Sequence, residues 1–563
     1  MTMKRWVWPL GCTALALGLL ACGWLVPAHL RAVDARVLMG AGRNTPSLVE
    51  RRMALVKANN PAAGQMLAEA ARVEFIPGSE RLRQAVTNAA TSAGHFSRAD
   101  AAQAVQSMAS DAEPITDLLI RLENRDRTLE TLGHSKNPAT RELLRCRELT
   151  NTVLFSASSS ASGQAFDAAL SVCGLLLDDG KLSGPMSNAV SQLVGRAVRE
   201  NNPEPLEQVL MAMMSLGQRL NWGELVEFAG SVEDGRTFGL LAHVARTADK
   251  RLAVVFAGVV LSGQPGAVAR YLLDYSRTGL DDLGAALHFG AGGVKELVRR
   301  DQRVYSSEVR RRIVAGLGLN GALSSVSDDC WRAPGIALAA KWFLYLCGGF
   351  LLAVAMHFAR PAVRPLEKPL VVRGFHLARE SLFALGFLLV VLLLSEPFLA
   401  QESQKVDFHF RLRLPAVGGA VAAGVAGAKL PFMNPTSLLT LLLFFVLQAL
   451  LYTACLVKLA EIRRQNVQAR VKLRLLENEE HLFDAGLYLG FAGTIVSLIL
   501  VSLGVSKFSL MAAYSSTSFG IIFVSIFKIF HLRPVRRLLL MESETATAQP
   551  FGATVSPSFA TPT

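Results

Sequence analysis

The chain has 563 residues, of which 51% are hydrophobic, and its mean hydropathy is +0.33. Its apolar residues gather in long uninterrupted runs, which indicates membrane spans and excludes a protein built only around a soluble core. The net charge is +13, and many lysines and arginines flank the apolar runs, so the charge favours membrane orientation over nucleic-acid binding.

The first 30 residues predict a membrane anchor. After a short basic start, residues 6–30 contain no Asp, Glu, Lys or Arg and are long enough to cross a bilayer. Residues 26–28 (VPA) resemble a signal-peptide cleavage site, so a signal segment that is removed stays open as the alternative.

Residues 31–335 predict a helical domain. Charged residues return here, and short amphipathic patterns are separated by Gly, Pro, Asn and Asp. We expect a first helix from Pro46 with Thr45 as its N-cap, a break at residues 59–61, and a second helix to about Val73.

Later in this domain, residues 238–300 contain helical units in close succession, which suggests stacked helical hairpins or a short solenoid. Residues 156–162 (SASSSAS) predict a low-complexity loop. Cys146 and Cys173 could form a disulfide outside the cytoplasm, and two buried free thiols fit the sequence equally well. The cysteine spacing in the chain predicts no metal site.

Five further apolar segments follow, so we expect six spans. They are residues 336–358, 381–399, 437–459 and two helices within 483–530, which a turn at residues 506 and 507 separates. The loop 400–436 contains a strictly alternating stretch, residues 406–414, that predicts a strand. Residues 542–563 are rich in Ser, Thr and Pro and predict a disordered tail.

The distribution of charge predicts the orientation of the spans. Lysines and arginines are concentrated in 359–380, in 460–482 and after residue 530, and all three stretches fall on one side if six spans alternate. Basic connections face the cytoplasm, so 31–335 and 400–436 are expected outside. We therefore expect an all-α polytopic membrane protein with six transmembrane helices and a large extracytoplasmic helical domain. The predicted boundaries are 1–30 for the anchor, 31–335 for the helical domain, 336–436 for two spans with the outward loop, 437–541 for the last membrane module and 542–563 for the tail.

Signatures of catalysis are missing from the sequence. No GxSxG, HExxH, GxxxxGK[ST] or GxGxxG pattern occurs in a catalytic setting, so we expect neither enzymatic activity nor a cofactor. The histidines near the span ends are too scattered to predict a metal site, and they are His357, His376, His409 and His481.

Ionisable groups inside the spans are costly and are therefore functional candidates. Glu396, near the outer end of the third span, either reaches the interface or pairs or takes a proton inside the bundle. Asp484, at the inner mouth of the fifth span, either receives an ion or caps a helix. Lys341, Lys458 and Lys528 lie near span ends and are expected to extend to the interface.

Small and hydroxylated residues line one face of each of the last two predicted spans. Those of the fifth span are Gly486, Gly490, Gly493, Thr494 and Ser497, and those of the sixth are Ala513, Ser516, Thr517 and Gly520. The glycines and the alanine let two helices approach closely. The hydroxyl groups leave two interpretations open: tight packing alone, or a polar seam in which Thr494, Thr517, Ser497 and Ser516 line a path for water or protons.

The same residues resemble the MotA/TolQ/ExbB proton-channel family. The pair Gly493-Thr494 in one span and the run AAYSSTSFGI, residues 512–521, in the next are similar to the family's Gly-Thr and Ala-Ala…Thr…Gly patterns. The resemblance implies that Thr494 and Thr517 face a channel and that Gly520 packs helices. It covers the module 437–541, and the position of the acidic residue in the family's transport branch falls on Ala512.

The resemblance also implies how such a protein works. It implies a homo-oligomer in the bacterial inner membrane, with residues 31–335 in the periplasm and a single-span partner that supplies a transmembrane Asp. Proton flow would then drive movement of that partner. The alternative is a non-conducting membrane scaffold whose helical domain binds a protein partner.

Overall fold

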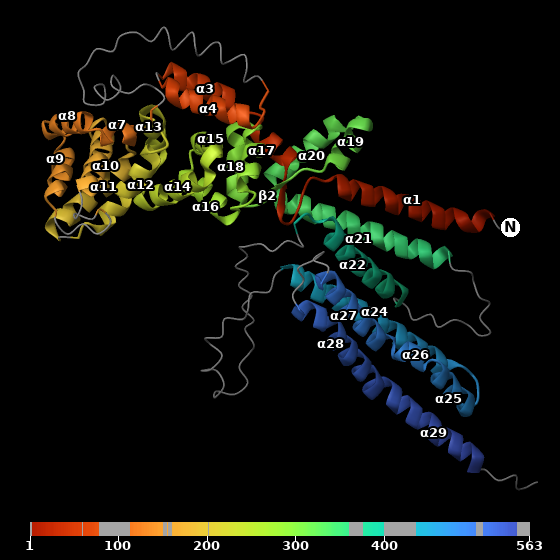
Figure 1. The fold of residues 1–563 in the computed structure, drawn as a ribbon. Coiled ribbons are helices and arrows are strands. Elements are labelled where there is room, and N and C mark those ends of the chain that lie inside the picture. Colours follow the sequence, from red (N-terminus) through yellow and green to blue (C-terminus); the bar gives the residue numbers. More distant parts are fainter. Residues whose placement is uncertain are drawn as a thin grey trace, which may run out of the picture. The chain divides into compact units, whose positions relative to one another are not determined.

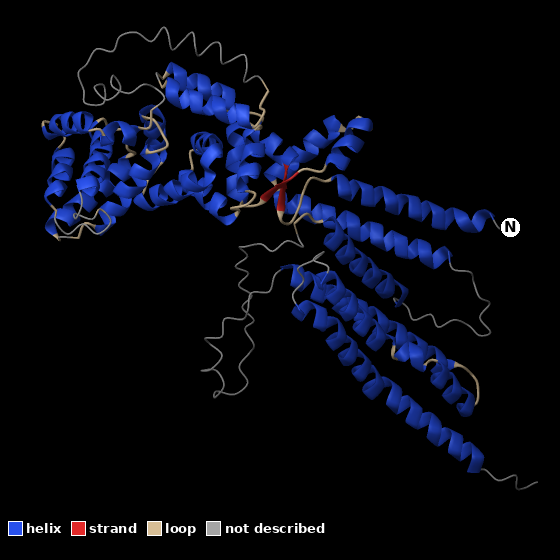
Figure 2. Cartoon of the chain, in the orientation of Figure 1, coloured by secondary structure: helices blue, strands red, loops and turns tan. Residues whose placement is uncertain are grey.

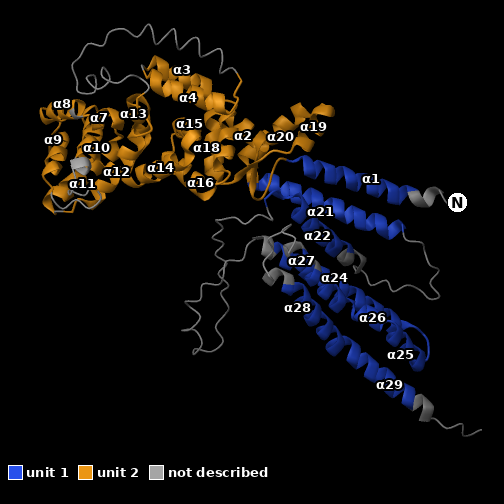
Figure 3. Cartoon of the chain, viewed as in Figure 1, with its two compact units in different colours: residues 1–26, 335–563 blue, residues 27–334 orange. Residues whose placement is uncertain are grey.

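The computed structural model describes residues 3–58, 60–77, 113–149, 155, 160–200, 202–359, 375–398, 435–502 and 510–548. These residues are almost wholly helical, and two three-residue elements are the only strands among them (Figures 1 and 2). The chain divides into two compact units, which Figure 3 distinguishes by colour. Unit 1 comprises residues 1–26 and 335–563, and unit 2 comprises residues 27–334.

Unit 1 is built from long apolar helices. In chain order they are α1 (Met3–Leu25), α21 (Pro334–Ala359), α22 (Phe375–Ser395), α24 (Pro435–Arg464), α27 (Ala485–Ser502) and α28 (Leu510–Phe527). More polar helices complete the unit: α25 (Ala469–Asn478), α26 (Glu480–Phe483) and, after a π-helical turn at Lys528–Leu532, α29 (Arg533–Ala548).

Four helical stretches in the described part of the chain are long and apolar enough to cross a membrane. They are Val7–Leu25, Pro334–Ala359, Leu439–Arg464 and Tyr514–Glu544. The third and fifth predicted spans are also helical, as α22 and α27, but their apolar stretches, Glu380–Ser395 and Ala485–Ile495, are shorter. The all-helical class is therefore confirmed, with four candidate membrane spans.

Two glycines on α21 let its neighbours approach closely. A Cβ on Gly348 would lie 2.9 Å from the Leu20 side chain of α1, and a Cβ on Gly349 would lie 2.8 Å from the Phe387 ring of α22. These distances are shorter than normal carbon contacts, so a larger residue at either position would push the helices apart.

An apolar cluster ties the ends of α24 and α28 to the helices that follow them. Its buried members are Cys455, Leu459, Ile462, Leu476, Phe483, Phe527 and Leu539. The helical stretch that begins with α28 continues through the π-helical turn into α29, which packs on α25 and ends at Ala548, well past the predicted span. The predicted tail is therefore wrong in its first residues, which are helical, and residues 549–563 lie outside the described part.

Unit 2 contains seventeen described α-helices and both strands. They are β1 (Ala32–Asp34), α2 (Ala35–Gly42), α3 (Leu48–Lys57), α4 (Pro61–Val73), α7 (Ile115–Ile120), α8 (Leu122–Gly133), α9 (Pro138–Arg145), α10 (Ser160–Asp178), α11 (Gly184–Arg199), α12 (Glu204–Gly217), α13 (Trp222–Ser231), α14 (Gly235–Ala248), α15 (Leu252–Ser262), α16 (Pro265–Asp274), α17 (Gly279–Leu287), α18 (Gly290–Arg300), β2 (Arg303–Tyr305), α19 (Glu308–Gly316) and α20 (Asn320–Arg332).

Alternate helices of unit 2 lie against one another. The helices α10, α12, α14 and α16 are in contact in that order, while α15 contacts α4, α13 and α17. This succession is the arrangement that stacked helical hairpins produce. All of α15 after Leu252 is buried, which explains why its sequence, LAVVFAGVVLS, has almost no polar face.

The first and last segments of unit 2 lie together. The strands β1 and β2 pair in parallel, with Val33 opposite Val304, and α2 contacts both α18 and α20. Asp34 caps α2 by accepting a hydrogen bond from the Arg36 backbone, and its carboxylate also forms a buried ion pair with Arg310 of α19. Residues about 270 positions apart therefore form one small polar cluster.

The predicted N-cap of the first helix in this domain is wrong by two residues. Ser47, not Thr45, caps α3, because the Ser47 hydroxyl accepts from the Glu50 backbone while the Glu50 carboxylate accepts from the Ser47 backbone. Thr45 instead accepts a hydrogen bond from the Gly292 backbone of α18. The break near residue 60 and the end of the second helix at Val73 are confirmed.

Two further predictions for unit 2 can be compared with the structure. The predicted loop 156–162 is wrong at its end, because α10 begins at Ser160, and residues 156–159 lie outside the described part. Cys146 and Cys173 are free thiols, and burial raises the pKa of Cys146 to about 11 and that of Cys173 to about 12. The predicted strand 406–414 and the turn at residues 506 and 507 also lie outside the described residues.

Candidate functional site

The antiparallel helices α27 and α28 pack along the two predicted faces of small residues. A Cβ on Gly490 would lie 2.7 Å from the Ser516 carbonyl oxygen, and a Cβ on Gly520 would lie 2.7 Å from the Gly486 carbonyl oxygen. Gly493 faces the Ser516 hydroxyl in the same way. Because no side chain larger than hydrogen fits these positions, the two backbones come close enough for short side chains to meet between them.

The two predicted channel threonines meet at this contact. The hydroxyl oxygens of Thr494 and Thr517 lie 2.6 Å apart, and they lie 3.1 Å and 3.3 Å from the Gly490 carbonyl oxygen. Two hydroxyl protons can satisfy these three contacts in more than one arrangement, because each hydroxyl both donates and accepts. Thr494 is 7% exposed, so this hydrogen-bonded group is inside the helix pair.

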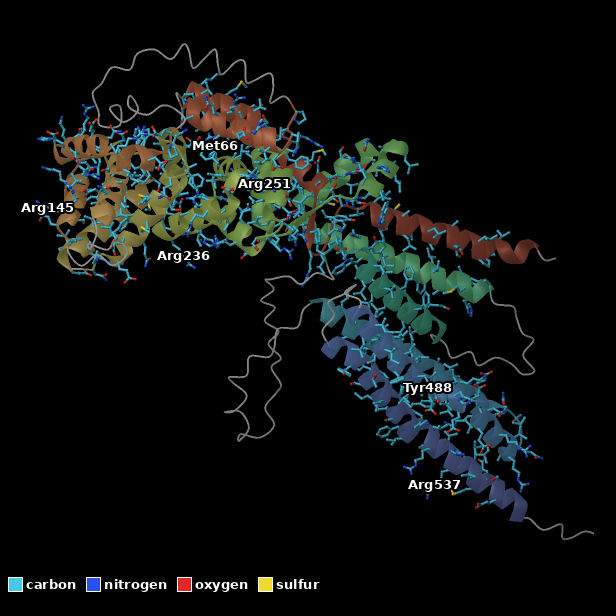
Figure 4. The ribbon with its side chains drawn as sticks, viewed as in Figure 1. Met66, Arg145, Arg236, Arg251, Tyr488 and Arg537 are labelled. Atoms are coloured by element: carbon cyan, nitrogen blue, oxygen red, sulfur yellow. The ribbon has the colours of Figure 1, made fainter. Side chains whose placement is uncertain are left out.

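The structure describes the side chains of only some of the other residues predicted on the two faces. Ser516 is buried against Gly493. Ser497 and Ala513 lie within α27 and α28, but their side chains are outside the described part of the structure. Tyr488 of α27, labelled in Figure 4, is 58% exposed and therefore does not belong to the buried contact between the two helices.

Gln448 of α24 is a polar residue of this site that the sequence reasoning missed. Its amide nitrogen donates to the Gly486 carbonyl oxygen at 2.9 Å, and the residue is 2% exposed. Its amide oxygen is buried and has no hydrogen-bond partner among the described residues, so it can still accept a hydrogen bond. The signal was present, because Gln448 is the single Gln or Asn within the predicted span 437–459.

Charged and aromatic groups continue the polar line from Gly486 to the end of the helices. Lys528 lies 2.7 Å from Asp484, the residue that directly precedes α27. The Tyr452 hydroxyl of α24 lies 2.9 Å from His531 Nε2. Asp484 stands directly before α27, where its backbone carbonyl accepts a hydrogen bond from the Tyr488 backbone, and its two predicted roles, helix capping and receipt of an ion, stay predictions.

Glu396 belongs to a different pair of helices. It directly follows α22, and its carboxylate accepts a hydrogen bond of 3.1 Å from Lys341 of α21. Both side chains are at most 2% exposed, so the expected extension of Lys341 to the interface is wrong, and Glu396 follows the alternative of pairing inside the bundle. Burial of both charges is tolerable because each neutralises the other.

A cavity between α21 and α22 in unit 1 is lined mostly by apolar side chains. It has a volume of about 410 Å³ and is lined by Leu346, Cys347, Phe350, Leu351, Ser381 and Ala384. Ser381 is the one residue of this lining that carries a hydroxyl group. The cavity therefore lacks the polar side chains that meet around Thr494, Thr517 and Gln448.

Comparison of the chain with known protein families, characterised proteins and solved structures finds no match.

Proposed function

We propose that this chain is a proton-channel-like subunit of an energy-coupling complex in the bacterial inner membrane. In this proposal all six apolar helices cross the membrane and unit 2 is periplasmic, as the distribution of basic residues predicts. A homo-oligomer of the chain works with a single-span partner that contributes a transmembrane Asp. The observation that carries the proposal is the buried hydroxyl pair of Thr494 and Thr517, extended by Gln448, in helices that are otherwise apolar.

The chemistry of this seam supports proton movement rather than passage of a larger ion. The contacts at Gly490 and Gly486 lie one helical turn apart along α27, and the Asp484–Lys528 pair follows within another turn. Hydroxyl and amide groups can relay a proton through water, but none of them holds a charge. A carboxylate supplied by a partner would give the proton a resting place, which is why the proposal requires one.

Substitution of each threonine by valine tests the proposal. Thr494→Val or Thr517→Val keeps the side-chain shape and removes the hydroxyl, so helix packing should survive while proton flux is abolished. The measurement is acidification of vesicles that contain the complex isolated in mild detergent, under an imposed membrane potential. Ser518→Ala is the matched control, because its hydroxyl bonds only to its own helix at the Tyr514 carbonyl oxygen. Flux at the wild-type rate in both threonine variants contradicts the proposal.

A second candidate function is a non-conducting scaffold. The observation that favours it is that Thr494 and Thr517 are satisfied by each other and by Gly490, as tight packing alone would require. The two functions differ in where the partner binds. Deletion of residues 31–335 removes every partner of a scaffold, whereas a channel subunit keeps a single-span partner through its membrane helices.

A further inference from the structure

The helix α19 leaves a row of apolar side chains uncovered. Val309 is 63% exposed, Ile313 is 42% exposed and Leu317, directly after the helix, is 64% exposed. Their spacing of four residues places them on one face of the helix. Two residues of α19 are buried, Arg310 and Val314, so most of the helix surface is open.

The position of Arg310 fixes which face of α19 is open. Its guanidinium forms a buried ion pair with Asp34 and lies 5.9 Å from the centre of the Tyr305 ring. The hydroxyl of Ser307 caps the helix by accepting from the Arg310 backbone at 3.3 Å. Rotation of α19 to bury Val309 and Ile313 would remove a buried arginine from its carboxylate, which is strongly unfavourable.

Arginines accompany the apolar row. Arg311 and Arg312 are both largely exposed, and both pair with the same carboxylate, that of Glu308 one turn earlier. Two cations that share one anion leave a net positive charge on the open surface of the helix. An apolar row on one face, with exposed arginines on the rest of the helix surface, is the pattern of a helix that lies in the headgroup region of a bilayer.

The chain connects α19 to two candidate membrane helices, and residues 317–333, most of them in α20, separate α19 from α21. The helix α20 ends at Arg332, and α21 begins two residues later at Pro334. The strand β2, three residues before α19, pairs with β1, which begins seven residues after the end of α1 at Leu25. Seven residues reach roughly 25 Å at most. The strand pair that precedes α19 and the helix α20 that follows it are therefore both close along the chain to helices that can cross a membrane.

We propose that α19 is an interfacial helix that binds the lipid surface. Val309, Ile313 and Leu317 insert between the acyl chains, and Arg312, which lies nearer to the row than Arg311 does, contacts lipid phosphates. These covalent connections raise the effective concentration of lipid at α19, so even a short apolar row binds effectively. The proposal requires that α1 and α21 cross a membrane, and it does not depend on proton conduction.

A nitroxide spin label on Ile313→Cys tests the proposal in the full chain, reconstituted in vesicles of three parts phosphatidylethanolamine to one part phosphatidylglycerol. Its collisions with oxygen, which concentrates in lipid, and with a water-soluble nickel chelate report what surrounds it. Ala315→Cys is the matched control, because position 315 is exposed on the opposite face of the same helix. We expect several-fold fewer nickel collisions at position 313 than at 315, together with more oxygen collisions.

Two other outcomes overturn the proposal. Equal nickel collisions at 313 and 315 mean that the row faces water, and low collisions with both reagents at 313 mean that a second copy or another protein covers it. Val309→Cys and Leu317→Cys repeat the measurement at the ends of the row and guard against a local disturbance at 313. The unmodified chain gives the background from the native cysteines.

Discussion

Glu224 combines two roles that depend on different protonation states. It is the third residue of α13, where its carboxylate accepts from the Asn221 backbone at 3.1 Å and its own backbone donates to the Asn221 side chain at 2.9 Å. It is also 9% exposed, and this burial raises the pKa of its carboxyl to about 7, against the opposing effect of the Asn221 hydrogen bonds. The folded protein therefore holds this proton more tightly than the unfolded chain does.

This raised pKa predicts that unit 2 loses stability as the pH rises. The contribution is complete below the ordinary glutamate pKa of 4.5 and is lost as the pH rises through about 7. This contribution to the free energy of unfolding amounts to about 3 kcal/mol, because one pKa unit corresponds to about 1.4 kcal/mol. Thermal unfolding of the full chain, followed by circular dichroism at about pH 5 and about pH 8, measures it.

The variant Glu224→Gln isolates this contribution. Glutamine keeps the capping geometry of α13 and has no proton to release, so the variant should lose less stability than the wild type over the same pH range. The stability of the variant should still fall somewhat as the pH rises, because burial also raises the pKa of Asp282, to about 6. Identical pH dependence in the two proteins would show that Glu224 does not titrate in this way.

At the scale of the elements, one ion pair and one contact between a histidine and a carboxylate join α21 to α22 and the residue that follows it. Lys341 pairs with Glu396, and His357 lies 3.9 Å from Glu380. Lys341 and His357 are sixteen residues apart, and so are Glu380 and Glu396. The two contacts therefore lie about 24 Å apart along helices that run antiparallel. They differ in strength, because the first pair is almost completely buried and His357 is partly exposed.

Removal of Lys341 should therefore destabilise unit 1. Lys341→Met leaves the Glu396 carboxylate buried without its cation, which costs about 3–5 kcal/mol, and addition of Glu396→Gln should restore much of this loss. Thermal unfolding in detergent measures both variants. Lys458→Met is the control, because Lys458 is partly exposed and its pairs with Glu461 and Glu479 should contribute about 0–1 kcal/mol. Equal stability of Lys341→Met and the wild type would contradict this account.

The sequence predicted the local features of these elements better than their contacts. Apolar runs identified α1, α21, α24 and α28, because the length of such a run is itself the signal. Small residues at helical spacing identified the faces along which α27 and α28 pack, but not the direct contact between Thr494 and Thr517. The positions of Gln448 and of the Lys341–Glu396 pair were not predicted either, because a single polar residue in a span does not reveal which neighbouring helix it faces. The cap of α3 could have been predicted, since Glu50 follows Ser47 by three residues.

At the scale of the whole molecule, long-range pairing escaped the sequence analysis. The strands β1 and β2 are three residues each, too short for an alternating pattern, and they pair across almost the whole of unit 2. The structure divides the chain after residues 26 and 334, and the predicted boundaries after residues 30 and 335 lie close to these positions, because the change from apolar runs to amphipathic patterns falls there. Orientation relative to the membrane remains a prediction from charge alone.

Charge predicts that Gly263 of unit 2 and Gln465, directly after α24, lie on opposite sides of the membrane. Gln465 is preceded by Arg463 and Arg464, and the connection after it is rich in Arg and Lys, whereas the connection from α1 into unit 2 lacks such a concentration. Fusions truncated at each position report the compartment: alkaline phosphatase should be active after Gly263, and a green fluorescent reporter should fold after Gln465. Both reporters in one compartment would exclude six alternating spans and, with them, the proposed channel. The buried pair of Lys341 and Glu396 would still stand, since it depends on the packing of α21 against α22 and not on which side each end faces.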